Sequence, residues 1–230
     1  MGIRRGSIST PIIADGLVLN MDAANKASYI PYATSAYNTA SGSLTPVGSL
    51  VNDVGFLQPP VSASSWDFDG IDDRIDCGVW TPLNGASGCT ISFWIKSGID
   101  ASNAYIIARA ESTPQFMIFQ KATNNYIWYR LYTGTNYTVQ GGAVLDNEWH
   151  NCILVYNGST LEIFEDGVSI DSTSVTGTLP VSTSPLRVAS YAGGAPFKSG
   201  LISNIHIYNR GLTSNEVLHN YNALKGRFSS

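Results

Sequence analysis

Apolar and polar side chains alternate along most of this chain of 230 residues. In the run from Cys89 to Lys96, Cys89 and every second residue after it are apolar, and Thr90, Ser92 and Lys96 fall on the opposite face. A period of two residues is typical of a β-strand with one buried face. The pattern therefore predicts a strand over residues 89–96.

Similar runs recur along the chain, separated by turn residues. Asn157-Gly158, the strongest short signal for a β-hairpin, joins two of them, and Glu165-Asp166-Gly167 marks the next turn. These runs predict antiparallel hairpins and a meander. The expected strands cover residues 105–108, 115–120, 127–132, 137–140, 148–156, 161–164, 168–170, 186–191 and 201–208.

The run 201–208 is apolar on both faces, with Leu201, Ser203, Ile205 and Ile207 expected on the same side. Strands buried on both faces lie inside a sheet, so this run predicts a central strand.

The two ends of the chain depart from the alternating pattern. Thr213 and Glu216 have the spacing of a capping box, and apolar residues then recur at helical spacing up to Gly226, which predicts a short helix over about 213–225. Residues 1–14 are polar, carry Arg4 and Arg5 and are interrupted by Pro11. We expect them to form an extended arm that anchors to a neighbour, and residues 15–230 to form one domain that includes the helix.

Composition supports an all-β sandwich and excludes several functions. Only 13% of the residues are charged, and glycine is abundant, with 22 residues, as in proteins with many tight turns. A net charge of −4 argues against a nucleic-acid partner. No apolar run is long enough for membrane insertion. The first residues lack the apolar stretch of a secretory signal. We therefore expect the protein to reach the outside of a cell, if it does, by lysis or by assembly into a larger particle. The three cysteines, Cys77, Cys89 and Cys152, are expected to be buried thiols.

Five aspartates crowd the segment from Trp66 to Asp76, at a turn between two expected strands. Crowded carboxylates are hard oxygen ligands for calcium, and the candidate set is Asp22, Asp69, Asp72 and Asn204, with Asp73 and Asn25 as further options. In the alternative interpretation these carboxylates cap backbone amides of the turn, Asp73 pairs with Arg74 or faces water, and no metal binds.

Aromatic and cationic residues share one face of the expected strand 127–132. Trp128, Arg130 and Tyr132 alternate there, and Tyr129 faces the other way. Flat rings beside a cation can stack on a sugar or grip a protein partner. Alternatively, Trp128 covers the sandwich edge and Arg130 faces solvent.

Several segments together resemble the laminin G-like branch of the concanavalin A-like lectin/glucanase superfamily. They are Gly16-Leu17-Val18-Leu19-Asn20-Met21-Asp22-Ala23, Phe68-Asp69-Gly70-Ile71-Asp72-Asp73, Thr90-Ile91-Ser92-Phe93-Trp94-Ile95, Trp149-His150, Phe164-Glu165-Asp166-Gly167 and Ile205-His206-Ile207-Tyr208-Asn209-Arg210-Gly211-Leu212. The resemblance implies a jelly-roll sandwich of two antiparallel sheets, one of them concave, with a variable surface for a ligand or partner. It also implies a calcium, usually held by an acidic residue just before the Ile-Tyr-Asn-Arg segment of the last strand, where this chain has Ser203-Asn204.

The glucanases of the superfamily use two carboxylates on one face of a strand, and this pattern does not occur here. Glu162 and Glu165 are three residues apart, which places them on opposite faces of a strand. His150 is interpreted as a structural histidine, because neither a metalloprotease motif nor a nucleophile elbow occurs. The chain is therefore predicted not to be an enzyme.

The opening segment 15–25 and the ending segment 216–228 are similar to structural proteins of marine bacteriophages. This similarity predicts a non-catalytic structural and adhesive protein on the virion surface, as a capsid decoration, head fibre or tail component. Its expected partners are other virion proteins, further copies of this chain and a host surface glycan. The alternatives are a free extracellular lectin and a glycan-cleaving enzyme.

Overall fold

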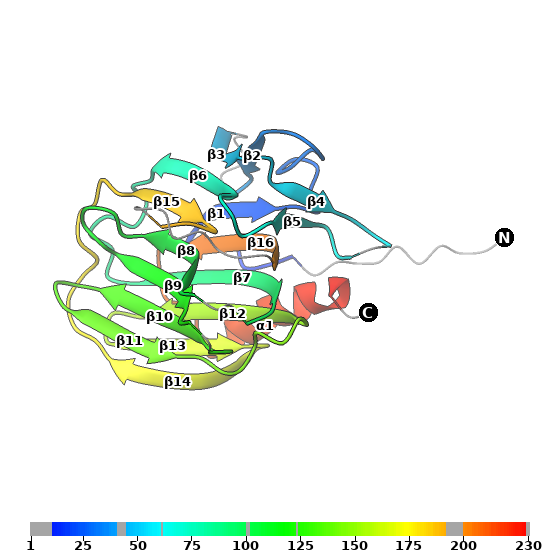
Figure 1. Ribbon diagram of the computed structural model, residues 1–230. Coiled ribbons are helices and arrows are strands. Elements are labelled where there is room, and N and C mark those ends of the chain that lie inside the picture. Colours follow the sequence, from blue (N-terminus) through cyan, green and yellow to red (C-terminus); the bar gives the residue numbers. More distant parts are fainter. Residues whose placement is uncertain are drawn as a thin grey trace.

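Two eight-stranded antiparallel sheets stack on each other, and a C-terminal helix lies on one of them (Figure 1). The computed structural model describes residues 11–40, 45–60, 62–99, 102–122, 124–191 and 200–228. This architecture confirms the predicted all-β sandwich. Within the described residues, no helix is both long and apolar enough to cross a membrane.

The strands of each sheet follow one another through hydrogen-bonded neighbours. Sheet A has the order β14 (Val168–Ser174), β13 (Thr160–Glu165), β12 (Trp149–Tyr156), β7 (Cys89–Ser97), β16 (Gly200–Tyr208), β5 (Ser65–Phe68) and β4 (Gly55–Leu57), and β1 (Leu17–Asp22) also pairs with β16. Sheet B has the order β11 (Asn136–Gln140), β10 (Ile127–Tyr132), β9 (Phe116–Gln120), β8 (Ala104–Arg109), β15 (Pro185–Val188), β6 (Arg74–Val79), β3 (Thr45–Val51) and β2 (Ser35–Asn38). The meanders β8 to β11 and β12 to β14 follow the predicted hairpins.

The core lies between the sheets and is built from the faces that the alternation predicted to be buried. In sheet A, Phe93 of β7 stands opposite Ile205 of β16 on one side and Cys152 of β12 on the other, and all three are fully buried. Burial of each large apolar side chain contributes about 1.5–3 kcal/mol. Such rows hold the two sheets together. Cys89 and Cys152 are buried free thiols, as expected, whereas Cys77 is only half-buried.

Strand β16 is central, as predicted, but its facing pattern differs from the prediction. The register shifts between Ile202 and Ile205, which is a β-bulge. Ile202, Ile205 and Ile207 therefore enter the core together. The expectation that Leu201 shares their face was wrong, because the bulge breaks the period of two.

The C-terminal helix α1 (Ser214–Leu224) begins at the predicted capping box, in which the Thr213 hydroxyl accepts from the Glu216 amide. Its bounds agree with the predicted 213–225 to within one residue at each end. The chain then tightens into a 3₁₀ turn, η1 (Lys225–Arg227), which directs Arg227 and Phe228 back onto sheet A.

The last residues of the predicted arm contact the helix and the sheet beneath it. The Ile13 amide donates to Asn220 Oδ1 at 2.8 Å, and the Tyr208 hydroxyl donates to the Ile13 carbonyl at 3.0 Å. Arg4 and Arg5 lie outside the described residues, so the anchoring arm stays a prediction.

Candidate functional site

The strand β10 presents a row of aromatic and cationic side chains on the outer face of sheet B. Its burial alternates strictly, so that Tyr129 points into the core and Trp128, Arg130 and Tyr132 are half-buried on the outer side. The predicted shared face is thus confirmed. We call these three residues, with Tyr105, Phe119, Lys121 and Tyr191 beside them, the β10 face.

Ring contacts connect this face across neighbouring strands. Tyr105 stacks on Tyr191 with centroids 4.7 Å apart and contacts Phe119 at 5.7 Å. The Arg130 guanidinium lies 5.3 Å from the centre of the Phe119 ring. Because β10 is an inner strand and β11 is the edge of sheet B, Trp128 does not cover the sandwich edge.

The cations of the β10 face are held over its rings. Lys121 Nζ lies 4.0 Å from the centre of the Trp128 ring, and Arg130 Nε donates to Thr138 Oγ1 at 3.2 Å. Cation–π contacts of this kind contribute about 0.5–1 kcal/mol at exposed sites. The sequence analysis did not identify Tyr105, Phe119 and Lys121, because the pairing register of the strands brings them next to the β10 residues.

The acidic turn links the two sheets, because β5 belongs to sheet A and β6 to sheet B. One carboxylate oxygen from each of Asp69, Asp72 and Asp73 lies within 4.8 Å of the other two. The Asp69 amide donates to Asp73 Oδ2 at 3.0 Å, and the Ile71 amide donates to Asp69 Oδ1 at 2.8 Å. Part of the predicted capping is therefore present, but Asp73 is only 3% exposed and does not face water.

One oxygen of this cluster has no protein donor. Asp73 Oδ1 is buried and accepts no hydrogen bond from the described part of the chain. Burial raises the pKa of Asp73; the hydrogen bond from the Asp69 amide opposes this, and the charges of Asp69, Asp72 and Asp67 add to it. A buried, orphaned carboxylate oxygen among further carboxylates is a donor set that suits a calcium ion, so these residues fit one.

The other two residues of the predicted calcium set lie elsewhere. Asp22 stands opposite Asn204 across β1 and β16, and its carboxylate accepts hydrogen bonds of 2.8 Å from both terminal nitrogens of Arg227. The Arg227 guanidinium thus already balances the negative charge of Asp22, in place of the predicted calcium. Asn204 is fully buried, and within the described residues its amide has no hydrogen-bond partner.

The acidic residues of the meander do not form a catalytic pair. Glu165 points into the sandwich, where both its oxygens accept from the Gly142 amide, and Glu162 points outward and accepts from Ser169. Burial raises the pKa of Glu165, against the opposing hydrogen bond from Gly142.

His150 is held at both ring nitrogens. Its Nδ1 lies 2.7 Å from Asp166 Oδ2 and its Nε2 lies 3.2 Å from Asp146 Oδ1. The hydrogen bond with Asp166 is the main cause that raises the His150 pKa. With both nitrogens bound to carboxylates, the ring has no free nitrogen to activate a nucleophile, which supports a structural role.

A family model described as the concanavalin A-like lectin/glucanases superfamily matches residues 69–218. The chain belongs to this superfamily. The match covers the acidic turn, the β10 face and the last strand. Comparison with curated protein sequences gave no match.

Solved structures of toxin binding domains share the fold. The binding domain of Paraclostridial Mosquitocidal Protein 1 has a TM-score of 0.73 at 14% identity, over 91% of this chain and 52% of that one. The binding domain of botulinum neurotoxin DC in complex with SialylT has 0.70 at 14%, over 92% and 52%. The same domain in complex with rat synaptotagmin II has 0.67 at 14%, over 92% and 52%. This chain thus spans about half the length of these domains.

Proposed function

We propose that this chain is a non-catalytic, lectin-like attachment domain on a phage particle, and that the β10 face contacts a glycan or a neighbouring virion protein. The observation that carries the proposal is the row of connected rings and cations on the outer side of sheet B. The fold is shared with toxin binding domains solved in complex with SialylT and with rat synaptotagmin II. The similarity of the opening and ending segments to phage structural proteins supports the location on a particle.

The chemistry of this face suits a ligand with both apolar and acidic parts. Aromatic rings stack on the C–H face of a sugar, while the charges of Arg130 and Lys121 attract a carboxylate on a sugar or a protein. The rings and the Arg130 guanidinium are held by contacts with one another, so little conformational freedom is lost on binding.

Glycan-array binding of the full chain tests the role of the face. Trp128→Ala and Arg130→Ala should each weaken binding at least tenfold, as expected for residues at the centre of an interface. Val168→Ser, at an exposed position of β14 in sheet A, is the control and should bind as the wild type does. Equal binding by all three variants would contradict the assignment of the β10 face.

The location is tested by mass spectrometry of purified virions. A high copy number would indicate a capsid decoration, and a few copies per particle a tail component. Absence from particles, together with glycan binding by the isolated chain, would favour a free lectin. Turnover of a polysaccharide that is lost in Glu162→Gln or Glu165→Gln would overturn the non-catalytic role.

We also propose that Asp69, Asp72 and Asp73 hold a calcium ion, which would neutralise the crowded carboxylates between β5 and β6. A ligand at 100 times its Kd stabilises a protein by about 2.7 kcal/mol. Calcium should therefore raise the Tm of the wild type and of Asp171→Asn, an exposed control in β14, but not of Asp73→Asn. An equal rise in all three would contradict the site.

A further inference from the structure

The turn before β2 places a tyrosine where the backbone favours glycine. The Ala33 amide donates to the Ile30 carbonyl at 2.9 Å, Pro31 occupies the second position, and Tyr32 follows with φ of 67°. This is the arrangement of a type II turn, whose third position needs a positive φ and is usually glycine or asparagine. A bulky residue there is a genuine outlier.

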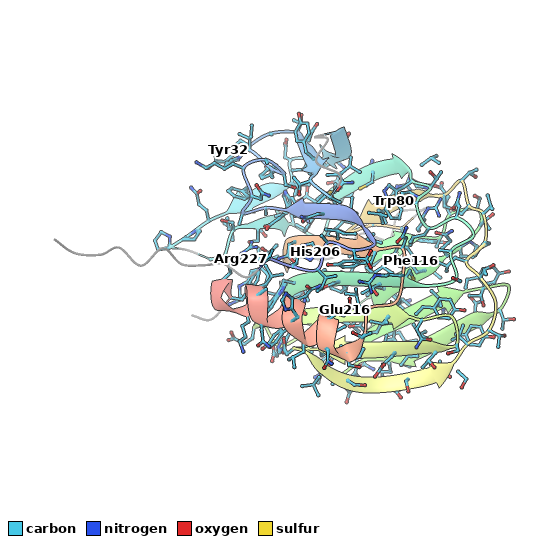
Figure 2. All side chains as sticks on the ribbon, turned by 180° about the vertical axis from the view of Figure 1, so that it is seen from behind. Tyr32, Trp80, Phe116, His206, Glu216 and Arg227 are labelled. Carbon is cyan, nitrogen blue, oxygen red and sulfur yellow. The ribbon has the colours of Figure 1, made fainter. Side chains whose placement is uncertain are left out.

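The tyrosine ring does not compensate by packing. Tyr32 is 85% exposed, and the neighbouring Ile30 is 60% exposed. Figure 2 shows Tyr32 at the periphery of the molecule, among the first segments of the chain and away from α1. Residues held in strained backbone conformations cluster at binding and active sites.

A surface groove of about 310 Å³ adjoins this ring. Phe56 and Leu50, both half-buried, contribute its apolar part, and the ring of the buried Tyr29 lies 5.2 Å from that of Phe56. Thr34 and Asp53, both exposed, contribute a hydroxyl and a carboxylate. The groove lies between β2 and β3 at one edge of sheet B and β4 at the edge of sheet A.

We propose that this groove binds the ring of a neutral saccharide. The proposal rests on the lectin-like function proposed above and adds a second site to it. A sugar ring presents one apolar C–H face, which stacks on aromatic rings, and a rim of hydroxyls, which donate to a carboxylate and exchange hydrogen bonds with a hydroxyl. The groove supplies both, and its volume falls in the range of small-ligand sites.

The charge of the groove selects against acidic sugars. Asp53 is among its described lining residues, and neither lysine nor arginine is. A sialic or uronic acid would bring a second carboxylate to Asp53 without a cation to balance it. The β10 face, which carries Arg130 and Lys121, has the opposite preference.

The groove and the β10 face are separate sites. Five strand spacings divide β10 from β3 in sheet B, which at about 4.8 Å each is roughly 24 Å. Figure 1 shows β2, β3 and β4 at one end of the sandwich and β10 and β11 at the other. A substitution at one site should therefore leave the other intact.

The test is binding of the full chain to an array of neutral oligosaccharides of glucose, galactose, mannose and N-acetylglucosamine, with sialylated forms beside them. Tyr32→Gly removes the ring and gives the turn its preferred residue, so the variant should keep or raise its Tm while losing at least tenfold in affinity for neutral sugars. Tyr32→Phe keeps the ring and should bind within a few-fold of the wild type. Asp53→Asn should reduce the preference for neutral over sialylated forms.

The outcomes separate this proposal from the function proposed above. Loss of neutral-sugar binding in Tyr32→Gly, but not in Trp128→Ala, supports the groove. Loss in Trp128→Ala alone overturns the groove and leaves the β10 face as the glycan site. Wild-type protein that binds no neutral sugar, or a dimer that dissociates in Tyr32→Gly, also overturns the groove, because the occupant is then absent or is a second copy of the chain.

Discussion

Stability between pH 4 and 7 should depend strongly on His206. This histidine lies on β16, opposite Asn20 of β1 and Ser92 of β7, and only 2% of it is exposed. Burial lowers its pKa from the ordinary 6.5 to about 4, while the charge of Asp22 acts in the opposite direction and that of Arg227 adds to the lowering. The folded protein therefore keeps this ring neutral at pH values where the unfolded chain protonates it.

The sign and size of the effect follow from this difference. Above pH 6.5 both states hold a neutral ring, and as the pH falls towards 4 only the unfolded state gains the proton, so stability is lost. The two pKa values of His206 differ by about 2.5 pH units, and one unit corresponds to about 1.4 kcal/mol. The free energy of unfolding should thus fall by about 3 kcal/mol from this residue alone.

Urea denaturation at pH 7.5 and pH 4.5 measures the loss. His206→Gln is neutral throughout, so the wild type should lose about 2–3 kcal/mol more than the variant between the two pH values. In a chain of this size that is a Tm difference of about 5–10 °C. Equal losses in both proteins would show that the ring is protonated or solvated in the folded state, and would refute the reasoning.

Three further substitutions test the contacts that hold the fold. Arg109→Met should lower the free energy of unfolding, measured by urea denaturation, by about 3–5 kcal/mol, because the neutral acceptors of this fully buried guanidinium lose their donor. The control Arg187→Met, at a half-buried ion pair, should lower it by about 1 kcal/mol or less. Similar losses in the two variants would contradict the role of Arg109. In the wild type, the Asp166 carboxylate raises the pKa of His150, so this residue stabilises the fold below pH 6.5 and the stabilisation is lost as the pH rises through the folded pKa. His150→Gln should remove this pH dependence, which the Tm values of the wild type and the variant between pH 6 and 8.5 measure. Parallel Tm profiles of the two proteins would count against the role of His150. Phe228→Ala should lower stability by about 2–4 kcal/mol in a thermal melt, since its ring stacks at 4.0 Å on a buried tryptophan, and an unchanged Tm would exclude that role.

Local alternation was sufficient to predict most strands, and failed where strands are short or broken by glycine and proline. The run 89–96 became β7 with one residue added. Strands β3 and β4, with sequences Thr-Pro-Val-Gly-Ser-Leu-Val and Gly-Phe-Leu, show no period, because tertiary pairing and not side-chain alternation places them. The change of sheet between β5 and β6 is likewise invisible in a local pattern.

The candidate sites follow the same division. The shared face of Trp128, Arg130 and Tyr132 could be predicted, because it depends only on the period of one strand. The calcium set could not, because Arg227 reaches Asp22 from a 3₁₀ turn that is 205 residues away in sequence. Asp69 and Asp72 were found together because they lie in one turn, and Asp73 completes the cluster.

Tyr32 differs from the other non-glycine residues that adopt a positive φ. Among the described residues, the non-glycine positions with positive φ are mostly asparagine and aspartate, which tolerate this conformation. Ala189 is one exception, but it is fully buried in the core, and its amide donates to the Ile106 carbonyl at 2.8 Å. Packing and hydrogen bonding can therefore offset its strain of about 1–2 kcal/mol. Tyr32 is the other exception, and its exposed ring gains no comparable burial. A glycine at position 32 would serve the turn equally well, so the ring itself is what the position provides, and the groove beside it is where a ligand would use that ring.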